Sequence, residues 1–258
     1  MTIAAQGLTL EDVCIMLDGR PMVHVSAHVA PGDVLTIMGP SGSGKSTFLA
    51  YIGGFLDGAF RGLGKVYLNG QSIEHQPAEQ RHVGILFQDA LLFPHMSVGQ
   101  NLLFAIPAKI KDRSERRRLA EEALKEVGLA GLFDRDPATL SGGQEARVAL
   151  IRVLLSTPKA LLLDEPFSKL DADRRLSIRK IVFDLAKARN LPVLLVTHDA
   201  ADAKAAGGHA PFRQIQRKPR QIRFQKFRLI LRFQRAGPLL GPEPVADPRF
   251  SSPGASGA

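Results

Sequence analysis

Hydrophobic and polar residues alternate in short runs along the first part of the chain, where glycine, proline and asparagine interrupt the apolar stretches. Residues 8–38 carry several such runs, divided by the turn sequences LDGRP and APGD. Short apolar runs between turn residues are typical of β-strands joined in hairpins. A further hairpin is predicted for GKVYLNGQSI, with Asn69-Gly70 as its two-residue turn.

The middle of the chain, from about residue 89 to 157, is predicted to be more helical. In SERRRLAEEALKEVGL the apolar residues fall on one helical stripe, which consists of Leu119, Ala120, Ala123, Leu124 and Val127. Ser114 is the predicted N-cap of this helix, and Gly128 lies just past its end. A second helix is predicted for EARVALIRVLLSTP, which Pro158 ends because proline cannot continue a helix.

Three continuous apolar runs predict buried strands of a mostly parallel sheet. They are DVLTIM (33–38), ALLLDE (160–165) and PVLLVTH (192–198). DRRLSIRKIVFDLAKARN, between the last two runs, is predicted to form the helix that a crossover between parallel strands requires. Another helix is expected to begin in THDAADAKAAGG. The pattern therefore predicts an α/β fold.

GPSGSGKST, residues 39–47, directly follows the first of these strands and leads into a predicted helix. It fits the pattern G-x-x-x-x-G-K-[ST], in which glycines let backbone N–H groups point at phosphate oxygens. Lys45 would neutralise the β- and γ-phosphates of a nucleotide, and Ser46 would hold Mg²⁺. An ordinary glycine-rich turn is the alternative, which the flanking strand and helix disfavour. The candidate nucleotide-binding residues are Gly39, Ser41, Gly42, Ser43, Gly44, Lys45, Ser46 and Thr47.

Asp164 and Glu165 end an apolar strand, which is where a carboxylate reaches a metal ion bound at a neighbouring phosphate loop. Asp164 is the candidate Mg²⁺ ligand, and Glu165 is the candidate general base that polarises the attacking water. A pair of helix-capping acids is the alternative. The phosphate loop elsewhere in the chain favours the catalytic interpretation.

His198 and Gln88 also follow strand-like runs. His198 would lie at the carboxyl edge of the sheet, where its imidazole can form a hydrogen bond with the γ-phosphate. Gln88 can bind Mg²⁺ or orient water. A structural histidine and an exposed turn glutamine are the alternatives, and neither residue decides between them by itself.

Together these motifs resemble those of ABC-type ATPases. GPSGSGKST, Gln88, LSGGQ, LLLDEP, SKLD and His198 occur in the order and spacing of the family's Walker A, Q-loop, signature, Walker B, D-loop and H-loop. The match spans about residues 8–206. The resemblance implies a P-loop NTPase core with a mostly parallel sheet, an N-terminal antiparallel β subdomain and a helical signature subdomain at about 89–157. An ATPase domain at 1–206 and a separate C-terminal segment at 207–258 follow from it.

The resemblance also implies a role for the second glycine loop, LSGGQ, in a head-to-tail dimer. In the family, this motif closes on the γ-phosphate held by the other copy. The residues implied to act in this way are Ser141, Gly142, Gly143 and Gln144, and Asp171 is implied to lie at the same interface. ATP and Mg²⁺ are the implied ligands, and ATP hydrolysis is the implied activity.

LLFPHMSVGQNL further resembles ATPase subunits of binding-protein-dependent importers, such as those for ferric iron, sulfate, polyamines or thiamine. The implied partners are membrane permease subunits and a substrate-binding protein, at the cytoplasmic face of the cell membrane. A non-transport ABC ATPase is one alternative, although the 102 positions from Gly39 to Ser141 leave no room for the long coiled coil of DNA-repair types. A nucleotide-sensing cassette is another, which Glu165 and His198 disfavour.

Three positions depart from the family pattern. Leu17 stands where an aromatic residue usually stacks on adenine, which predicts loose base selectivity. Lys169, in the D-loop, replaces a small residue or asparagine. Glu145 follows LSGGQ where a basic or amide residue is usual. The last two changes are expected to tune the interface and not to abolish activity.

The composition limits the remaining classes of protein. The chain has 258 residues, of which 45 % are hydrophobic, so a sizeable core is possible. No apolar run approaches the roughly 20 residues needed to cross a bilayer, and MTIAAQGLTLEDV lacks the pattern of a signal peptide. The single cysteine, Cys14, excludes an internal disulfide, favours a reducing compartment and is expected to be buried.

The net charge of +9 belongs mainly to the C-terminal segment. Residues 207–258 hold ten of the 34 Lys and Arg residues and two of the 25 acidic residues. The nearly neutral remainder argues against nucleic acid as a partner of the body of the chain. For the basic segment itself three interpretations stay open: a divergent terminus of disordered composition, a segment that contacts anionic lipid, and a segment that binds nucleic acid.

Overall fold

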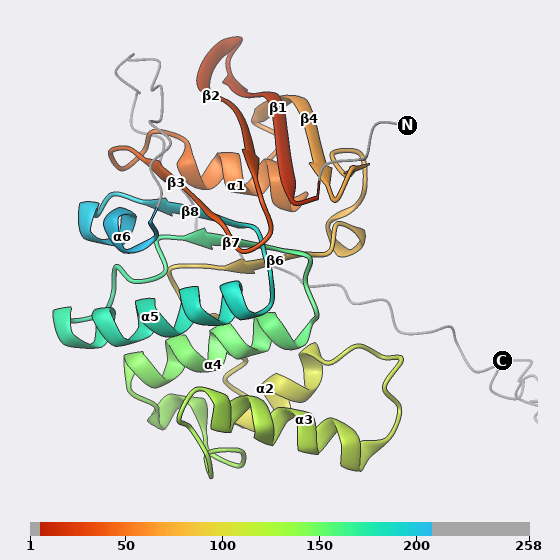
Figure 1. Ribbon diagram of the computed structural model, residues 1–258, viewed down its shortest axis with the longest axis vertical. Coiled ribbons are helices and arrows are strands. Elements are labelled where there is room, and N and C mark those ends of the chain that lie inside the picture. The colour runs from red at the N-terminus through yellow and green to blue at the C-terminus, as the bar shows by residue number, and fades with distance from the viewer. Residues whose placement is uncertain (1–5, 208–258) are drawn as a thin grey trace, which may run out of the picture. The chain divides into compact units, whose positions relative to one another are not determined.

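The structure is a computed structural model that describes residues 6–207 (Figure 1). The predictions for the basic segment at 207–258 therefore lie outside the described residues, except for Gly207. Two sheets and the helices packed on them make up the described part. Within it, no helix combines the length and apolar character that crossing a membrane requires.

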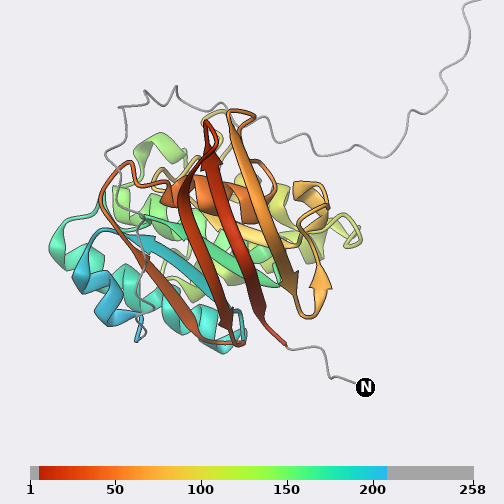
Figure 2. The ribbon, with the colours of Figure 1, turned by 90° about the horizontal axis from the view of Figure 1, so that it is seen from above.

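The N-terminal sheet is antiparallel, as expected (Figure 2). Its strands lie in the order β2-β1-β4-β5, with bounds Arg20–Val29, Leu8–Leu17, Phe60–Leu68 and Gln71–Ser72. The predicted turn between β4 and β5 is confirmed, since Asn69 and Gly70 both have positive φ, at 50° and 76°. Two consecutive left-handed residues match the twist of a tight hairpin.

Cys14 is only partly buried, so its predicted burial is wrong. Side chains on a strand alternate between the two faces of the sheet. Val13 and Ile15 take the fully buried face, and Cys14 between them points to the other. The partial burial that remains raises the pKa of its thiol.

The second sheet is parallel in all its described strands. The order is β3-β8-β7-β6, with bounds Val34–Met38, Val193–Thr197, Ala160–Asp164 and Val83–Leu86. The two central strands, β8 and β7, come from two of the three predicted apolar runs, and all five residues of β8 are buried. Helix α5, Ala172–Ala188, makes the predicted crossover from β7 to β8.

Helix α1, Lys45–Gly53, lies between the two sheets (Figure 1). Phe48, Leu49 and Ile52 are at most 1 % exposed and share one core with residues of both sheets. The opposite face of the parallel sheet packs on α5 and on α4, Gly142–Leu155. This layering places the N-terminus of α1 at one edge of the parallel sheet and α4 on the far face.

The remaining helices form the predicted helical region, apart from the short α6, Ala200–Ala205, which follows β8. Helices α2, Val98–Ala105, and α3, Arg113–Glu126, pack with α4 on a third core. The stripe predicted for α3 is confirmed: Ala120, Ala123, Leu124 and Val127 are buried, and Leu119 packs against them. Short 3-10 turns occur at Ala78–Gln80 and Pro137–Thr139.

The predicted N-cap of α3 is wrong by two residues. Asp112, and not Ser114, accepts a hydrogen bond from the backbone N–H of Glu115, at 2.8 Å. A carboxylate at this position also interacts favourably with the positive end of the helix dipole. The predicted end of the helix is confirmed, because Gly128 has a φ of 70° and its N–H donates to the Lys125 carbonyl.

Gly99→Ala tests the tight packing of α2. A Cβ at this position would lie 2.4 Å from a ring carbon of Phe133, whereas one at Gly58 would meet nothing within 4 Å. Gly99→Ala is expected to lower the free energy of unfolding by about 1–3 kcal/mol, and Gly58→Ala to change it by less than about 0.5 kcal/mol. Urea unfolding of both variants measures this, and equal stabilities would contradict the packing.

Candidate active site

The loop from Gly39 to Gly44 joins β3 to α1 at the carboxyl edge of the parallel sheet. Gly42 and Gly44 have φ of 78° and 89°, which other residues rarely adopt. No side chain caps the N-terminus of α1, so its first N–H groups face this loop. The Ser43 hydroxyl is buried and has no hydrogen-bond partner among the described residues. The loop is therefore built to accept an anion.

The Lys45 ammonium lies inside this loop. The residue is 4 % exposed, and its Nζ donates to the carbonyls of Gly39 and Pro40 at 2.8 and 2.9 Å. Burial lowers the pKa of Lys45, while the carboxylates of Glu165 and Asp164 oppose this shift. A cation held next to exposed N–H groups suits a phosphate chain.

Ser46 and Asp164 meet across 118 positions of sequence. The Ser46 hydroxyl, in the first turn of α1, donates to Asp164 Oδ1 at 3.0 Å, at the end of β7. Burial raises the pKa of Asp164, although the hydrogen bond from Ser46 opposes this shift. No group of three or more His, Cys, Asp and Glu side chains within residues 6–207 is arranged to hold a metal. A hydroxyl beside a carboxylate nevertheless offers the hard oxygen ligands that Mg²⁺ prefers.

Glu165 and His198 are brought together by the pairing of β7 with β8. Glu165 Oε1 lies 3.1 Å from His198 Nδ1 and 3.8 Å from Lys45 Nζ. The Glu165 backbone has a φ of 48°, and its N–H donates to the Val196 carbonyl at 2.9 Å. Left-handed backbone at a residue other than glycine costs energy and often marks a functional site. Three of the candidate side chains thus converge at one point.

A buried polar network holds the residues on either side of His198. The Thr197 hydroxyl donates to Asp202 Oδ2 at 3.0 Å and accepts from the N–H of Asp199, also at 3.0 Å. Asp202 in turn forms an ion pair with Arg179, and both residues are at most 5 % exposed. The sequence alone does not reveal this network, because its members lie on β8, α6 and α5.

Arg175 connects the same segment to the D-loop. Its guanidinium pairs with Asp199 and donates to the carbonyls of Ser168 and Leu170, at 3.4 and 3.3 Å. Asp171 itself caps α5, since its carboxylate accepts from the N–H of Arg174 at 3.0 Å. Two segments that the sequence analysis treated separately are therefore joined.

The other candidate residues lie outside this cluster. Gln88 follows β6 and is exposed, with no hydrogen bond to Ser46 or Asp164 in the described part of the chain. Ser141 is the N-cap of α4, where its N–H donates to Gln144 Oε1 at 2.9 Å, so Gly142 and Gly143 open the helix. That helix begins at Gly142, three residues before Glu145, where the sequence pattern predicted its first residue.

Two of the departures from the family pattern have neighbours that the sequence did not reveal. Leu17, near the end of β1, pairs in register with Phe60 of β4, so an aromatic residue lies on the adjacent strand. Lys169 forms an ion pair with Asp89, the residue after Gln88.

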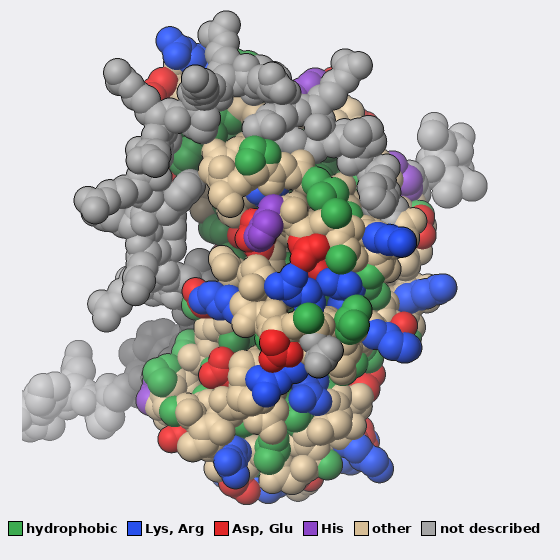
Figure 3. Space-filling model, turned by 90° about the vertical axis from the view of Figure 1, so that its left-hand side faces the viewer, with side chains coloured by type: hydrophobic (Ala, Val, Ile, Leu, Met, Phe, Trp, Pro, Cys, Tyr) green, Lys and Arg blue, Asp and Glu red, His purple; other side chains and the backbone are tan. Residues whose placement is uncertain are grey.

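On the face seen in Figure 3, basic and acidic side chains are interspersed. The expectation that the body of the chain does not bind nucleic acid stays a prediction.

Comparison with known proteins identifies similar chains. Residues 22–168 match the family model described as ABC transporter. The uncharacterized ABC transporter ATP-binding protein YnjD of Escherichia coli is 51 % identical over 199 residues, which cover 77 % of this chain and 91 % of that protein. The thiamine import ATP-binding protein ThiQ of Yersinia pseudotuberculosis is 41 % identical over 196 residues, 76 % of this chain and 81 % of that protein.

A third relative is longer than this chain. The spermidine/putrescine import ATP-binding protein PotA of Legionella pneumophila is 41 % identical over 180 residues, which cover 70 % of this chain. The match covers 49 % of that protein, so this chain spans about half of its length.

Removing Asp202 tests the network beside His198. Asp202→Ala leaves the Arg179 guanidinium buried without its partner, which is expected to lower the free energy of unfolding by about 3–5 kcal/mol. Asp184→Ala is the matched control, because it removes the exposed ion pair with Lys180 and is expected to cost about 0–1 kcal/mol. Guanidinium unfolding followed by circular dichroism measures both, and a similar cost for the two variants would contradict the network.

Proposed function

Because the chain belongs to the ABC transporter family, as an ATP-binding protein of importer type, we propose that it powers import through separate membrane subunits by forming a head-to-tail dimer with two shared ATP sites. The chain binds ATP and is an ATPase. One observation carries the dimer proposal. Lys45, Glu165 and His198 converge at the carboxyl edge of the parallel sheet, whereas the LSGGQ motif opens α4, which packs on the face of that sheet opposite α1.

The phosphate loop supplies the binding half of each site. The N–H groups of the loop from Gly39 to Gly44, the first N–H groups of α1 and the buried Ser43 hydroxyl bind the phosphate oxygens of ATP, together with the side chain of Lys45. Thr47 and Ser41 complete this set. The neutral N–H and hydroxyl groups bind phosphate oxygens at close range, and they do so without the cost of burying a second cation beside Lys45.

The metal ligands proposed here are Ser46, Asp164 and Gln88. The 3.0 Å contact between the Ser46 hydroxyl and the Asp164 carboxylate supports the first two. Mg²⁺, when bound, neutralises charge on the phosphates. Gln88 lies on the exposed segment after β6 and completes the set if this segment moves toward the loop.

Glu165 is the proposed general base, and His198 orients the reacting groups. Their 3.1 Å contact holds the carboxylate beside Lys45, where the γ-phosphate would end. Glu165 accepts a proton from the attacking water, and the His198 imidazole forms a hydrogen bond with the γ-phosphate. The polar network around Thr197 and Asp202 supports the orientation of His198.

The signature motif acts on the nucleotide of the second copy. Ser141, Gly142, Gly143 and Gln144 open α4, whose N–H groups are a second place for phosphate oxygens. Asp171, at the N-terminus of α5, lies in the segment that Arg175 joins to Asp199, the residue after His198, which suits a residue at the interface. ATP is thereby shared between two chains and stabilises the closed dimer.

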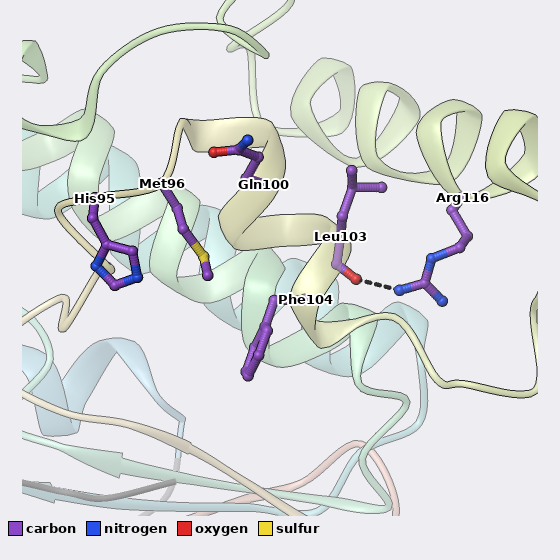
Figure 4. Close-up of a pocket in the computed structure, with 6 residues that line it drawn as sticks. All are labelled: His95, Met96, Gln100, Leu103, Phe104 and Arg116. Atoms are coloured by element: carbon purple, nitrogen blue, oxygen red, sulfur yellow. Dashed lines mark hydrogen bonds between the residues drawn. The ribbon is translucent and has the colours of Figure 1, made fainter. Parts of the chain in front are cut away.

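The membrane partner is proposed to dock on the helical region, beside the segment that follows Gln88. A pocket of about 510 Å³ opens there between the end of that segment, α2 and α3 (Figure 4). Three of its six lining residues are apolar, and the full set is His95, Met96, Gln100, Leu103, Phe104 and Arg116. Leu91 is 46 % exposed in the same segment. An exposed apolar surface of this kind suits a helix of a permease subunit.

The cargo is expected to be selected by other subunits. The named relatives import thiamine and spermidine or putrescine, which differ in chemistry although their ATP-binding proteins are equally similar to this chain. A substrate-binding protein and a peripheral position at the cytoplasmic face of the membrane complete the proposal. Leu17 in place of a stacking aromatic residue supports loose selectivity for the base.

Glu165→Gln is expected to lower the rate of Mg-ATP hydrolysis by about 10²–10⁴-fold, because the amide cannot accept a proton from water. The variant keeps the phosphate contacts, so it is expected to form dimers with ATP that sedimentation detects. Wild-type protein with ADP is the control and stays monomeric. A variant that remains monomeric with ATP would contradict the shared site.

Mixing two inactive variants tests the head-to-tail geometry. Lys45→Ala removes phosphate binding in one chain, and Ser141→Arg blocks the signature motif in the other. A mixed dimer contains one complete site, formed by the intact Lys45 of one copy and the intact Ser141 of its partner. The mixture is expected to recover part of the ATPase activity that each variant lacks alone. No recovery at any mixing ratio would count against this geometry.

A further inference from the structure

Arg152 joins the signature helix to the segment that follows Gln88. It lies near the C-terminal end of α4, and its Nη1 donates to the carbonyl of Leu91 at 2.8 Å. Its Nη2 donates to the carbonyl of Ala90 at 3.0 Å, and the guanidinium lies 5.5 Å from the ring centroid of Phe93. Three contacts thus fall within residues 90–93.

The environment of Arg152 is unusual for an arginine. Within residues 6–207, Arg152 forms no ion pair with a carboxylate. Its Nη1 has a further neutral acceptor, Asn101 Oδ1, at 3.3 Å. Burial lowers the pKa of Arg152 to about 10. A partly buried cation without a counter-charge destabilises a protein unless neutral acceptors compensate. The two backbone acceptors of Arg152, the carbonyls of Ala90 and Leu91, both lie on the segment after Gln88, which indicates that the guanidinium is retained to hold this segment.

Asn101 holds the rest of the same segment from α2. Its side chain is fully buried, its Oδ1 accepts from the N–H of Phe93 at 2.8 Å, and its Nδ2 donates to the carbonyls of Phe93, Met96 and Ser97 at 3.1–3.2 Å. Arg152 and Asn101 also contact each other, so α4, α2 and residues 90–97 form one hydrogen-bonded unit. Only Asp89 separates this unit from Gln88.

We propose that Arg152 is a positioning residue that ties Gln88 to α4, so that contact of Ser141 with the nucleotide of the second copy shifts Gln88 toward the metal site of its own chain. The inference rests on the proposed function of both motifs. Ser141 and Arg152 lie near opposite ends of one helix without proline, which moves as a rigid rod. Arg152 passes this displacement to Ala90 and Leu91, and hence to Gln88.

A purely structural clamp is the competing explanation, and Arg81 shows what such a clamp looks like. Arg81 is 6 % exposed and donates to the carbonyls of Tyr51 and Ile52, at 2.6 and 2.9 Å, at the end of α1. It makes two further bonds, to the carbonyls of Glu74 and Gln76. Like Arg152 it holds backbone oxygens, but none of them belongs to the segment after Gln88.

A double-mutant cycle between Arg152→Met and Gln88→Ala distinguishes the two explanations. The full chain is assayed for kcat, for the KM of ATP and for the Mg²⁺ concentration that gives half-maximal activity. Arg152→Met is expected to lower kcat by about 10–100-fold and to raise the Mg²⁺ requirement, with KM changed by less than about threefold. In the Gln88→Ala background the same substitution is expected to have no further effect, because Arg152 acts through Gln88.

Arg81→Met is the matched control. Its effect on activity is expected to be the same with and without Gln88, since its contacts do not involve that segment. Arg152→Lys keeps a donor for the carbonyls of Ala90 and Leu91 and is expected to restore part of kcat. It also provides the test if Arg152→Met does not fold, which thermal unfolding of each variant reports.

Independent effects of Arg152→Met and Gln88→Ala would overturn the inference, as would a normal Mg²⁺ requirement in the folded Arg152 variants. An unchanged Mg²⁺ requirement in Gln88→Ala would overturn it too. Failure of the proposed function would be seen separately, as an absence of ATP-dependent dimers of Glu165→Gln. This measurement does not depend on Arg152. Dimerisation together with an additive cycle would leave the shared-site dimer standing without this coupling.

Discussion

The parallel pairing of β7 with β8 is the constraint on which the rest of the site depends. The two strands are in register from Leu161 opposite Val193 to Asp164 opposite Val196, and nearly all of their side chains are buried. Because parallel strands end at the same edge, the residues that follow them, Glu165 among them, emerge side by side. The burial that fixes this register is hydrophobic, and it is the polar residues just past the strands that carry the chemistry.

The charged side chains of Lys45 and Asp164, which face the phosphate loop, are partly removed from water. Burial lowers the pKa of Lys45 and raises that of Asp164, which means that burial disfavours the charged form of each group. The left-handed backbone of Glu165 adds local strain at the same place. Sites that bind a highly charged ligand commonly accept such a cost in stability, and the hydrophobic core formed around Phe48 and Ile52 offsets it.

Arginines that hold backbone carbonyls recur where segments without regular structure meet helices. Arg81, Arg116 and Arg152 each donate to two or more carbonyl oxygens. The planar guanidinium offers several donors in fixed directions, so one side chain satisfies oxygens from more than one peptide. Around His198 two arginines pair with carboxylates: Arg179 with Asp202, and Arg175 with Asp199 in addition to its two carbonyls.

The sequence by itself determined the local structure and the chemical candidates. Apolar periodicity marked the strands and the stripe on α3, Asn69-Gly70 marked a hairpin, and the glycines at 39–44 marked a phosphate loop. These features depend on neighbours within a few positions, which a sequence pattern records directly. At the start of α3 the pattern indicated Ser114 as the N-cap, whereas Asp112 takes that position.

Only the tertiary structure decided which candidates meet. The contact of Ser46 with Asp164 and that of Glu165 with His198 depend on the order of the strands, and the partners of Arg152 and Arg175 lie on other elements. The position of α4 across the sheet from α1 likewise follows from how buried faces pack. Spacing along a chain does not encode these distances, because loop lengths permit many strand orders and packing of the core selects one.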